Sequence, residues 1–476
     1  MQRKDFSWGL WCFLLLTVLI LLGLYSLPSE LLGVKLKRVD LLSALRREES
    51  TDLQIQTAEE IFAKDKNESP AIATDSTPLL EQEEASRRQA LAEEYTIAQA
   101  RQDTLSAESK VLIQDYSEHR DALHHVVDAL DQKKRLRIAV LGDSFIEGDI
   151  FTYDLRRLLQ RQFGGYGVGW MPITSKVANF RKGIQHSFEG WKTLSVISHN
   201  KGKYFFGETY FIPTAEKAIV KYQWTEGLGK ISSAEIFYSS SEQILLTTEG
   251  SGEAIDSIYL SPSSTITAHR ITLSRDKVSF TFHQAKGAIL YGIALENNPS
   301  GGGVTVDNFS LRGSSGISLA NIDPSTALSM DKLRHYQLII LQYGLNVIEK
   351  ERLNYTAYAN RMVHVISTLK RLFPTSDILV MGVSDRAGNL GNGEKGTMKA
   401  VLALREAMRG VAMQCKVAYW DTYEAMQTRG GMVQFVAEGK AAKDYTHLSF
   451  SGGRYLASKF VESFLIEKDI YQHSKR

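Results

Sequence analysis

Apolar residues follow strand-like and helix-like spacings in alternation over much of the chain. A short apolar run at 137–141 precedes a helical pattern at 150–163. Further strand patterns lie at 304–311, 336–341, 377–383 and 417–420, and further helical patterns at 355–373 and 397–413. Such alternation is typical of right-handed βαβ crossovers and of a parallel sheet covered on both faces. We therefore predict an α/β fold with a doubly wound, mostly parallel sheet.

The pattern changes between residues 203 and 295. Short alternating apolar runs separated by Gly, Ser, Thr and Asn lie at 204–206, 218–222, 234–238, 244–246, 278–282 and 289–293. Runs of this kind predict a β-sandwich. We expect it to be an insert at 180–300, which interrupts an α/β domain built from 135–178 and 304–467.

The amino terminus carries a nearly uncharged apolar run at 6–27, after a short tail at 1–5. A run of about 20 such residues is long enough to cross a bilayer. A cleavable signal has a shorter apolar core, and Tyr25 to Pro28 makes a poor cleavage site. We expect an uncleaved, single-pass membrane anchor that contacts lipid.

Basic residues on both sides of this run leave its orientation open. Arg3 and Lys4 precede it, whereas five basic residues at 35–47 follow it, and that count opposes export of the remainder. The segment 31–45 is also amphipathic, so its charges fit an anionic membrane surface equally well. We expect the large domain outside the cytoplasm, on the periplasmic side.

The segment at 28–134 connects the anchor to the α/β domain. After the amphipathic stretch, 48–77 has the composition of a disordered linker. From Leu79 to Leu130 the pattern favours a helical stalk, without the sustained apolar heptads of a coiled coil. His124 and His125 fall within it, and adjacent helix residues face different ways, which predicts a solvated pair rather than a metal site.

Composition excludes few classes of function. The chain has 476 residues and a formal net charge of +2. This near-neutral charge gives no indication that the protein binds nucleic acid. It has two cysteines, Cys12 in the apolar run and Cys415 alone in the remainder. No disulfide is therefore expected within the large domain, and the cysteines do not indicate a compartment.

Two short motifs have the residue types of acyl-transfer chemistry. Ser144 lies in Gly-Asp-Ser at a predicted junction of strand and helix, where unpaired N–H groups favour developing negative charge. Asp444 and His447 stand three residues apart near the other end of the chain. A nucleophilic serine needs such a base and a partner that orients it. An N-cap at Ser144 and ordinary turn residues at 444–447 are the alternative interpretations.

Two other predicted strand ends offer hydrogen-bond donors. Gly313 follows the strand pattern at 304–311, and Asn346 follows the one at 336–341. A backbone N–H at Gly313 and the amide of Asn346 are suitable donors to an oxyanion. Gly and Asn are also common in turns after strands, which is the alternative.

Ser, Gly, Asn and Asp-x-x-His thus occur in one order, each at a predicted strand end, and in this the chain resembles the SGNH, or GDSL-type, hydrolase family. The resemblance implies that Ser144 is the nucleophile and that Asp444 and His447 complete a triad. It also implies an oxyanion hole formed by the Ser144 N–H, Gly313 and Asn346. It implies no cofactor and no metal.

The chain departs from the family pattern at two positions. Phe145 replaces the Leu of the Gly-Asp-Ser-Leu motif, and Val347 replaces an acidic residue that often follows the Asn. Neither position transfers a proton. The alignment of Gly313 is also open, because Gly316 or the glycines at 301–303 fit as well.

The runs at 142–149 and 163–170 resemble those of peptidoglycan or polysaccharide O-acetylesterases. Some relatives of this kind carry an inserted domain like a carbohydrate-binding module, which implies glycan contact here. Exposed Trp191, Trp224 or Tyr238 would stack on sugar faces, although aromatic residues in such strands are more often part of the core.

The sequence therefore favours a membrane-anchored serine esterase that removes O-acetyl or other small acyl groups from a cell-surface polysaccharide such as peptidoglycan. Two alternatives remain. The first is an O-acetyltransferase that passes an acyl group from a membrane acyltransferase partner to a glycan, and the second is a non-catalytic glycan-binding protein.

Overall fold

The computed structural model describes residues 110–198, 202–225, 231–250, 256–297, 302–391 and 393–475, together with two short strands near the amino terminus. These two strands, β1 (Glu30–Leu31) and β2 (Val34–Lys35), pair antiparallel within a separate unit formed by residues 1–53. The predicted anchor at 6–27 and the predicted linker at 48–77 lie outside the described residues. No helix of the described part is both long and apolar enough to span a bilayer.

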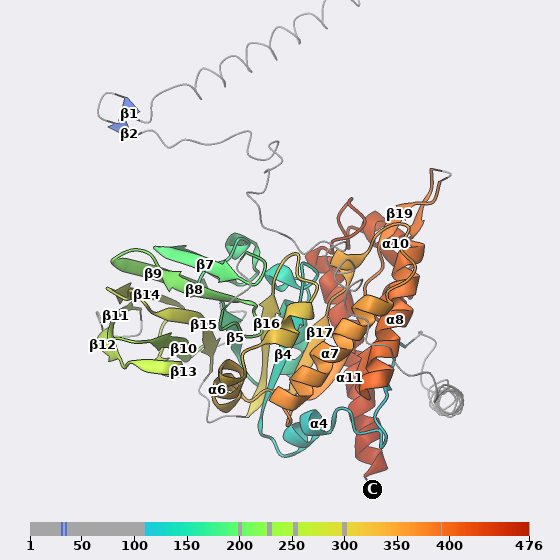
Figure 1. The fold of residues 1–476 in the computed structure, drawn as a ribbon, viewed down its shortest axis with the longest axis horizontal. Helices are drawn as coiled ribbons and strands as arrows, with labels where there is room; N and C mark the ends of the chain where they lie inside the picture. The colour runs from blue at the N-terminus through green and yellow to red at the C-terminus, as the bar shows by residue number, and fades with distance from the viewer. Residues whose placement is uncertain are drawn as a thin grey trace, which may run out of the picture. The chain divides into compact units, whose positions relative to one another are not determined.

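Six strands form the central sheet of the larger unit (Figure 1). Their order is β16 (Gly303–Ser310), β4 (Arg135–Gly142), β17 (Leu338–Gln342), β18 (Asp377–Met381), β21 (Ala418–Trp420) and β3 (Ile113–Asp115). All neighbours pair in parallel except β3, which is antiparallel to β21. The parallel strands have nearly continuous apolar runs because helices cover both faces of the sheet. The predicted mixed α/β class is confirmed.

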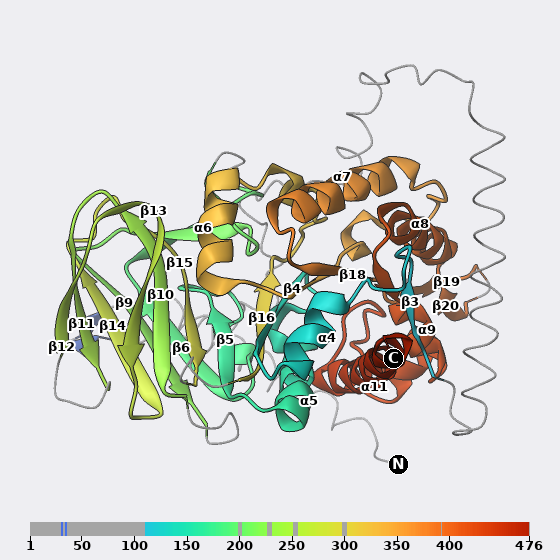
Figure 2. The same ribbon diagram turned by 90° about the horizontal axis from the view of Figure 1, so that it is seen from below.

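Helices flank this sheet on two sides, with α7 and α8 over one face and α5 and α11 over the other (Figure 2). The α-helices are α4 (His124–Asp131), α5 (Thr152–Phe163), α6 (Pro324–Arg334), α7 (Thr356–Leu372), α8 (Lys399–Cys415), α9 (Thr422–Gln427), α10 (Gly431–Ala437) and α11 (Phe450–Ser474). Four short 3-10 turns are η2 (Glu147–Asp149), η3 (Ala178–Phe180), η5 (Ile317–Asn321) and η6 (Leu345–Val347). A small hairpin joins β19 (Ala387–Asn389) to β20 (Lys395–Thr397).

Two antiparallel sheets lie beside the α/β part and face each other across a shared apolar core (Figure 1). The first contains β13 (Ser263–Thr272), β10 (Ser233–Ser240), β15 (Ile289–Glu296), β8 (Thr209–Pro213) and β7 (Trp191–Ser195), with β5 (Gly167–Met171) also paired to β15. The second contains β12 (Asp256–Leu260), β11 (Ile244–Glu249), β14 (Lys277–His283), β9 (Lys217–Trp224) and β6 (Ile184–Glu189). Alternate residues of these strands are buried between the sheets, as their period-two pattern predicts.

Three expectations about local structure are wrong. Residues 167–171 were expected in the α/β domain, but they pair with β15 and belong to the β-sandwich. Residues 204–206 form no strand, because their aromatic rings are buried in the core of the α/β part instead. The predicted helical stalk does not extend to Leu130, since 113–115 form an edge strand of the sheet and α4 packs beside β4.

A buried polar network ties the sandwich to the α/β part. Asp307 on β16 accepts hydrogen bonds from the Trp170 N–H of β5 at 2.8 Å and from the Tyr336 hydroxyl at 2.6 Å. Arg334 at the end of α6 pairs with Asp307 at 2.5 Å and with Glu296 of β15 at 2.6 Å. Asp307 and Arg334 are fully buried. Burying charges is tolerated only when they are paired in this way.

Candidate active site

Ser144 lies just past the end of β4, at the carboxyl edge of the parallel sheet. Gly142, the last residue of that strand, lies so close to β17 that a Cβ atom there would be 2.7 Å from the Gln342 carbonyl oxygen. The chain then turns, and the side chain of Asp143 accepts the Phe145 N–H at 2.9 Å. Glycine at position 142 therefore lets the chain turn tightly beside β17 and present Ser144.

The structure brings Ser144, His447 and Asp444 together in one hydrogen-bonded line. Ser144 Oγ lies 3.1 Å from His447 Nε2, and His447 Nδ1 lies 2.7 Å from Asp444 Oδ2. Asp444 Oδ1 also accepts the backbone N–H groups of Thr446 and His447, at 2.9 and 3.0 Å. The carboxylate thus holds both the backbone and the ring of the histidine, which fixes the position of Nε2 at the serine.

Solvent reaches this line from the Asp444 side. Partial burial acts to raise the pKa of Asp444, but the hydrogen bonds from His447 and Thr446 outweigh it and hold the pKa below its ordinary value. Asp444 therefore stays ionised at neutral pH. In this arrangement the imidazole can accept the Ser144 proton, and the carboxylate can stabilise the imidazolium that results.

Gly313 lies beside Ser144 because β16 and β4 end in register. Ser310 pairs with Gly142, and the Leu311 N–H donates to the Gly142 carbonyl at 3.0 Å. Gly313 follows in the left-handed region, with φ at 84°. Among the described residues, no acceptor is found for the backbone N–H of Gly313 or of Ser144. Two unused donors therefore stand on the loops that flank the serine.

Asn346 reaches the same edge from η6 but directs its amide elsewhere. Its Nδ2 donates to Asp143 Oδ2 at 3.0 Å and to the Ser314 carbonyl at 2.8 Å. Both N–H bonds of the amide are thus in use. Donation to an oxyanion would require Asn346 to share or break one of them. In this structure Asn346 links the loop that carries Ser144 to the loop that carries Gly313.

No pattern in the sequence indicates that two carboxyls near the site, those of Asp143 and Glu208, are buried. Burial raises the pKa of Asp143 to about 7, against the hydrogen bond from the Phe145 N–H. Glu208, which precedes β8 of the sandwich, accepts a hydrogen bond from the Ser318 hydroxyl of η5. Burial also raises the pKa of Glu208 above its ordinary value, against that hydrogen bond. Buried carboxyl groups of both the α/β part (Asp143) and the sandwich (Glu208) therefore pack near the site.

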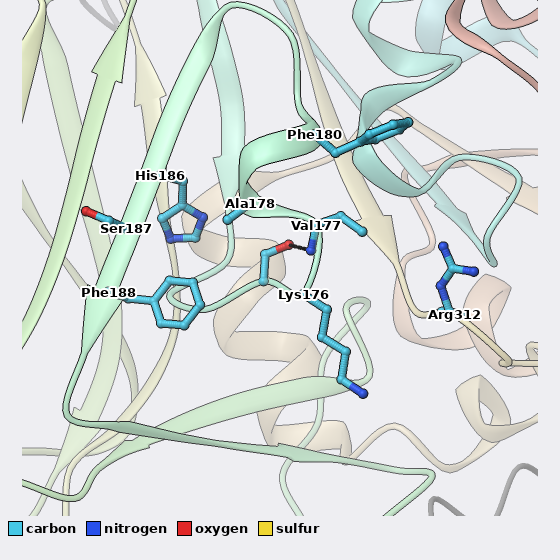
Figure 3. Close-up of a pocket in the computed structure, with 9 residues that line it drawn as sticks. Lys176, Val177, Ala178, Phe180, His186, Ser187, Phe188 and Arg312 are labelled. Atoms are coloured by element: carbon cyan, nitrogen blue, oxygen red, sulfur yellow. Dashed lines mark hydrogen bonds between the residues drawn. The ribbon is translucent and has the colours of Figure 1, made fainter. Parts of the chain in front are cut away.

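A pocket of about 640 Å³ lies beside η3 and β6, and Arg312 also lines it (Figure 3). Its lining residue Phe180 belongs to η3, and Arg312 is the residue before Gly313. The Phe180 ring packs against Gly148, four residues after Ser144, and stacks on Phe450 with ring centroids 4.9 Å apart. Phe450 begins α11, three residues after His447. One side chain of the pocket, Phe180, therefore contacts segments that follow both Ser144 and His447.

The three aromatic residues expected to face sugars are not exposed. Trp224 and Tyr238 are buried in the sandwich core, and the Tyr238 hydroxyl donates to the Ser261 carbonyl. Trp191 packs edge-on against Phe282 and donates its ring N–H to the Ile219 carbonyl at 2.8 Å. Their large apolar rings are needed to fill the space between the two sheets.

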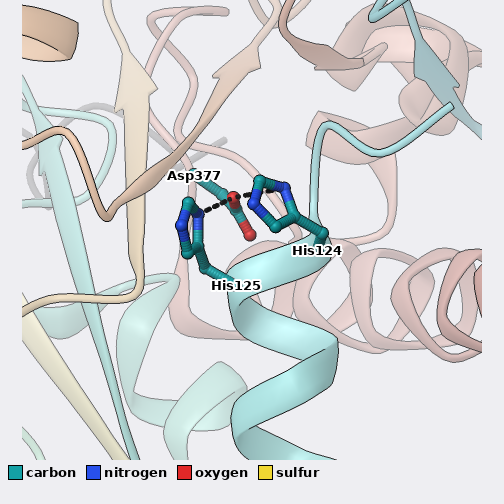
Figure 4. A group of neighbouring side chains, drawn as sticks. All are labelled: His124, His125 and Asp377. Carbon is teal, nitrogen blue, oxygen red and sulfur yellow. Dashed lines mark hydrogen bonds and ion pairs between the residues drawn. The ribbon is translucent and has the colours of Figure 1, made fainter. Parts of the chain in front are cut away.

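His124 and His125 do not form the solvated pair that was expected. Figure 4 shows both rings beside Asp377, the first residue of β18. His125 Nδ1 lies 2.8 Å from Asp377 Oδ1, and the Val126 N–H donates to Asp377 Oδ2 at 2.9 Å. Their possible metal-ligand atoms lie within 4.8 Å of one another, but Asp377 acts here as a cap for the start of α4.

We expect His125→Ala to lower the free energy of unfolding by on the order of 1 kcal/mol at pH 5.5 and by less at pH 8.5. The hydrogen bond to Asp377 raises the pKa of His125, so its stabilisation is complete below the unfolded-state pKa and disappears as the pH rises through the folded-state value. Urea unfolding at both pH values measures the difference, with His364→Ala on the exposed face of α7 as the control. A loss that is the same at both pH values would contradict this assignment.

No protein-family model matches this chain, and no curated protein matches it. Among solved structures, a peptidoglycan O-acetylesterase is similar over 74% of this chain and 99% of its own, with a TM-score of 0.60 and 21% identity. Protein YXIM from Bacillus subtilis is matched over 60% of this chain and 90% of its own, with a TM-score of 0.29 and 12% identity. A family two carbohydrate esterase from Clostridium thermocellum is matched over 52% and 91%, with a TM-score of 0.27 and 10% identity. The first comparison shows that this chain shares the fold of a peptidoglycan O-acetylesterase.

Proposed function

We propose that this protein is a serine esterase that removes O-acetyl or other small O-acyl groups from a cell-surface polysaccharide such as peptidoglycan. The observation that carries the proposal is the hydrogen-bonded line from Ser144 through His447 to Asp444 at the sheet edge. The fold shared with a peptidoglycan O-acetylesterase supports the choice of substrate class. The order of motifs supports assignment to the SGNH, or GDSL-type, hydrolases.

The proposed reaction has two halves. Ser144 Oγ attacks the ester carbonyl while His447 Nε2 takes its proton, and the tetrahedral oxyanion accepts the N–H groups of Ser144 and Gly313. His447 then protonates the departing sugar oxygen, which leaves an acetyl-serine. Water enters, gives a proton to His447 and releases acetate by the reverse sequence. Asn346 would assist only after a change in its present hydrogen bonds.

The location of this chemistry is part of the proposal. The apolar run at 6–27 is proposed to anchor the chain in the cytoplasmic membrane, with residues 110–476 on the periplasmic side, where a cell-wall glycan is accessible. The sandwich is proposed to contact the glycan in the manner of a carbohydrate-binding module.

Product analysis tests the proposed reaction. Purified protein is incubated with O-acetylated peptidoglycan, and both free acetate and glycan-bound acetyl groups are measured over time. We expect free acetate to appear at the rate at which bound acetyl is lost, because water is the acceptor. The variant His447→Ala is the control for spontaneous hydrolysis.

The same experiment separates the alternative functions. It is repeated with unacetylated glycan and an aryl acetate as acyl donor. Net gain of glycan acetyl groups would replace hydrolysis by transfer, with a membrane acyltransferase as the partner that supplies the acyl group. Binding of the glycan without release or transfer of acetate would favour a non-catalytic glycan-binding protein.

A further inference from the structure

A second pocket, of about 950 Å³, adjoins the first on the sandwich. The two share His186 and Ser187 of β6 as lining residues. The second pocket then continues over β9 and β14, where Lys221 and Lys277 line it. We call the two pockets together the insert groove. It extends from Arg312, beside Gly313, to strands in the second sheet of the sandwich.

Positive charge dominates this groove. Lys176, Lys221, Arg275 and Lys277 line it, and all four are exposed. None of them pairs with a carboxylate among the residues that the structure describes. Glu249 is the one carboxylate among the lining residues. This is a local excess of cations in a chain whose formal net charge is only +2.

The remaining two cations of the groove are already paired with carboxylates. Arg181 pairs with buried Asp149 at 2.6 Å, and Arg312 pairs with Glu147. Although burial opposes ionisation of Asp149, the charges of Arg156 and Arg181 hold its pKa well below the ordinary range. These pairs build the walls of the groove, whereas the four unpaired cations face solvent and are available to a ligand.

Exposed aromatic rings lie at the inner end of the groove. Phe180 and Phe188 line the pocket nearest Ser144 and are 50% and 39% exposed (Figure 3). Large exposed apolar groups in a concave site mark a place of contact with a ligand. A flat ring next to cations fits a ligand that has both apolar faces and negative charges.

We propose that the insert groove binds a polysaccharide bearing carboxylates and so guides an acylated sugar of the same chain toward Ser144. This inference rests on the proposed esterase function and adds the charge of its substrate. Sugar rings have apolar faces for Phe180 and Phe188, and carboxylates along the chain complement the unpaired cations. Two lining residues of the inner pocket connect it to the site, because Phe180 contacts Gly148 and Phe450 and Arg312 precedes Gly313. A glycan held in the groove would thus present its next sugars to Ser144 without a second binding event.

Binding of a defined polyanion tests the groove. The probe is an oligomer of galacturonic acid, with cellohexaose as the neutral comparison, and affinity is measured by calorimetry at 50 and 300 mM NaCl. We expect the full chain to bind the galacturonate oligomer more tightly than cellohexaose and to lose affinity in the higher salt. The variant K176Q/K221Q/R275Q/K277Q is expected to bind it about tenfold more weakly or worse, since each exposed ion pair contributes modestly.

The control variant removes the same charge elsewhere on the sandwich. K192Q/K203Q/K217Q/K286Q changes four exposed lysines that line neither pocket, and it should bind the galacturonate oligomer as the unmodified chain does. Equal weakening by both variants, or equal affinity for both sugars in both salts, would overturn the proposal. Tighter binding to phosphatidylglycerol vesicles than to the oligomer, lost in the groove variant, would overturn it in favour of a lipid surface.

Turnover of 4-nitrophenyl acetate keeps this test separate from the proposed function. The ester is too small to need the groove, so the groove variant should hydrolyse it at the unmodified rate. Absence of turnover in the unmodified chain would refute the esterase, whereas normal turnover with unchanged polyanion binding in the groove variant would refute the groove alone.

Discussion

Replacing Ser144 with alanine is expected to lower kcat/KM for 4-nitrophenyl acetate by a factor of about 10⁴ to 10⁶. The substitution removes the oxygen that lies 3.1 Å from His447 Nε2 and leaves the His447–Asp444 hydrogen bond in place. No acyl-serine can then form, and only the unused N–H donors and binding remain to assist attack by water. Release of 4-nitrophenolate, followed by absorbance, measures the effect directly.

The matched control is Ser329→Ala, which removes a hydroxyl from the exposed face of α6. It should leave the rate unchanged, and circular dichroism should show the same helix content for both variants. If Ser144→Ala retained more than a tenth of the activity, Ser144 would not be the nucleophile and another group would have to attack the ester.

Asp307→Ala is expected to destabilise the protein by roughly 3–5 kcal/mol, the cost of removing one partner from a buried ion pair. The substitution removes the acceptor of the Trp170 N–H and of the Tyr336 hydroxyl. It also removes one of the three carboxylates that pair with Arg334, the others being Glu235 and Glu296. None of these groups is reached by water. The midpoint of urea unfolding, followed by tryptophan fluorescence, should shift to lower concentration.

The control for this prediction is Asp469→Ala on the exposed side of α11. It should shift the midpoint little, as most surface substitutions do. Asp307→Asn retains the size of the side chain and should fall between the two. A shift for Asp307→Ala no larger than that of Asp469→Ala would mean that the buried network is not essential to the fold.

The α/β elements were predictable because their signal is local. Parallel strands that are buried on both faces, such as β4 and β17, are short apolar runs, and the helices between them keep one apolar face. The positions of Ser144, Gly313 and His447 were predictable for a related reason. Each follows a strand or precedes a helix that has such a signal, and strand ends meet at one edge of the sheet.

What was missed depends on contacts between distant residues. The run at 167–171 has the same composition whether it pairs in the central sheet or with β15. The packing of α4 depends on Asp377, which follows it by some 250 positions, and the buried state of Glu208 depends on Ser318. The orientation of the Asn346 amide is set by Asp143 and the Ser314 carbonyl. No periodicity within a short window contains this information.

The buried network also limits how this protein can be re-engineered. Asp307, on the strand that leads to Gly313, forms hydrogen bonds both within the α/β part and to a strand of the sandwich. Excising the sandwich, or grafting a different one, would therefore remove the Trp170 N–H from Asp307 and the Glu296 carboxylate from Arg334. A successful chimaera has to keep Trp170, Glu296 and Arg334 together with Asp307. The boundary for recombination therefore lies inside the α/β part rather than at the border between that part and the sandwich.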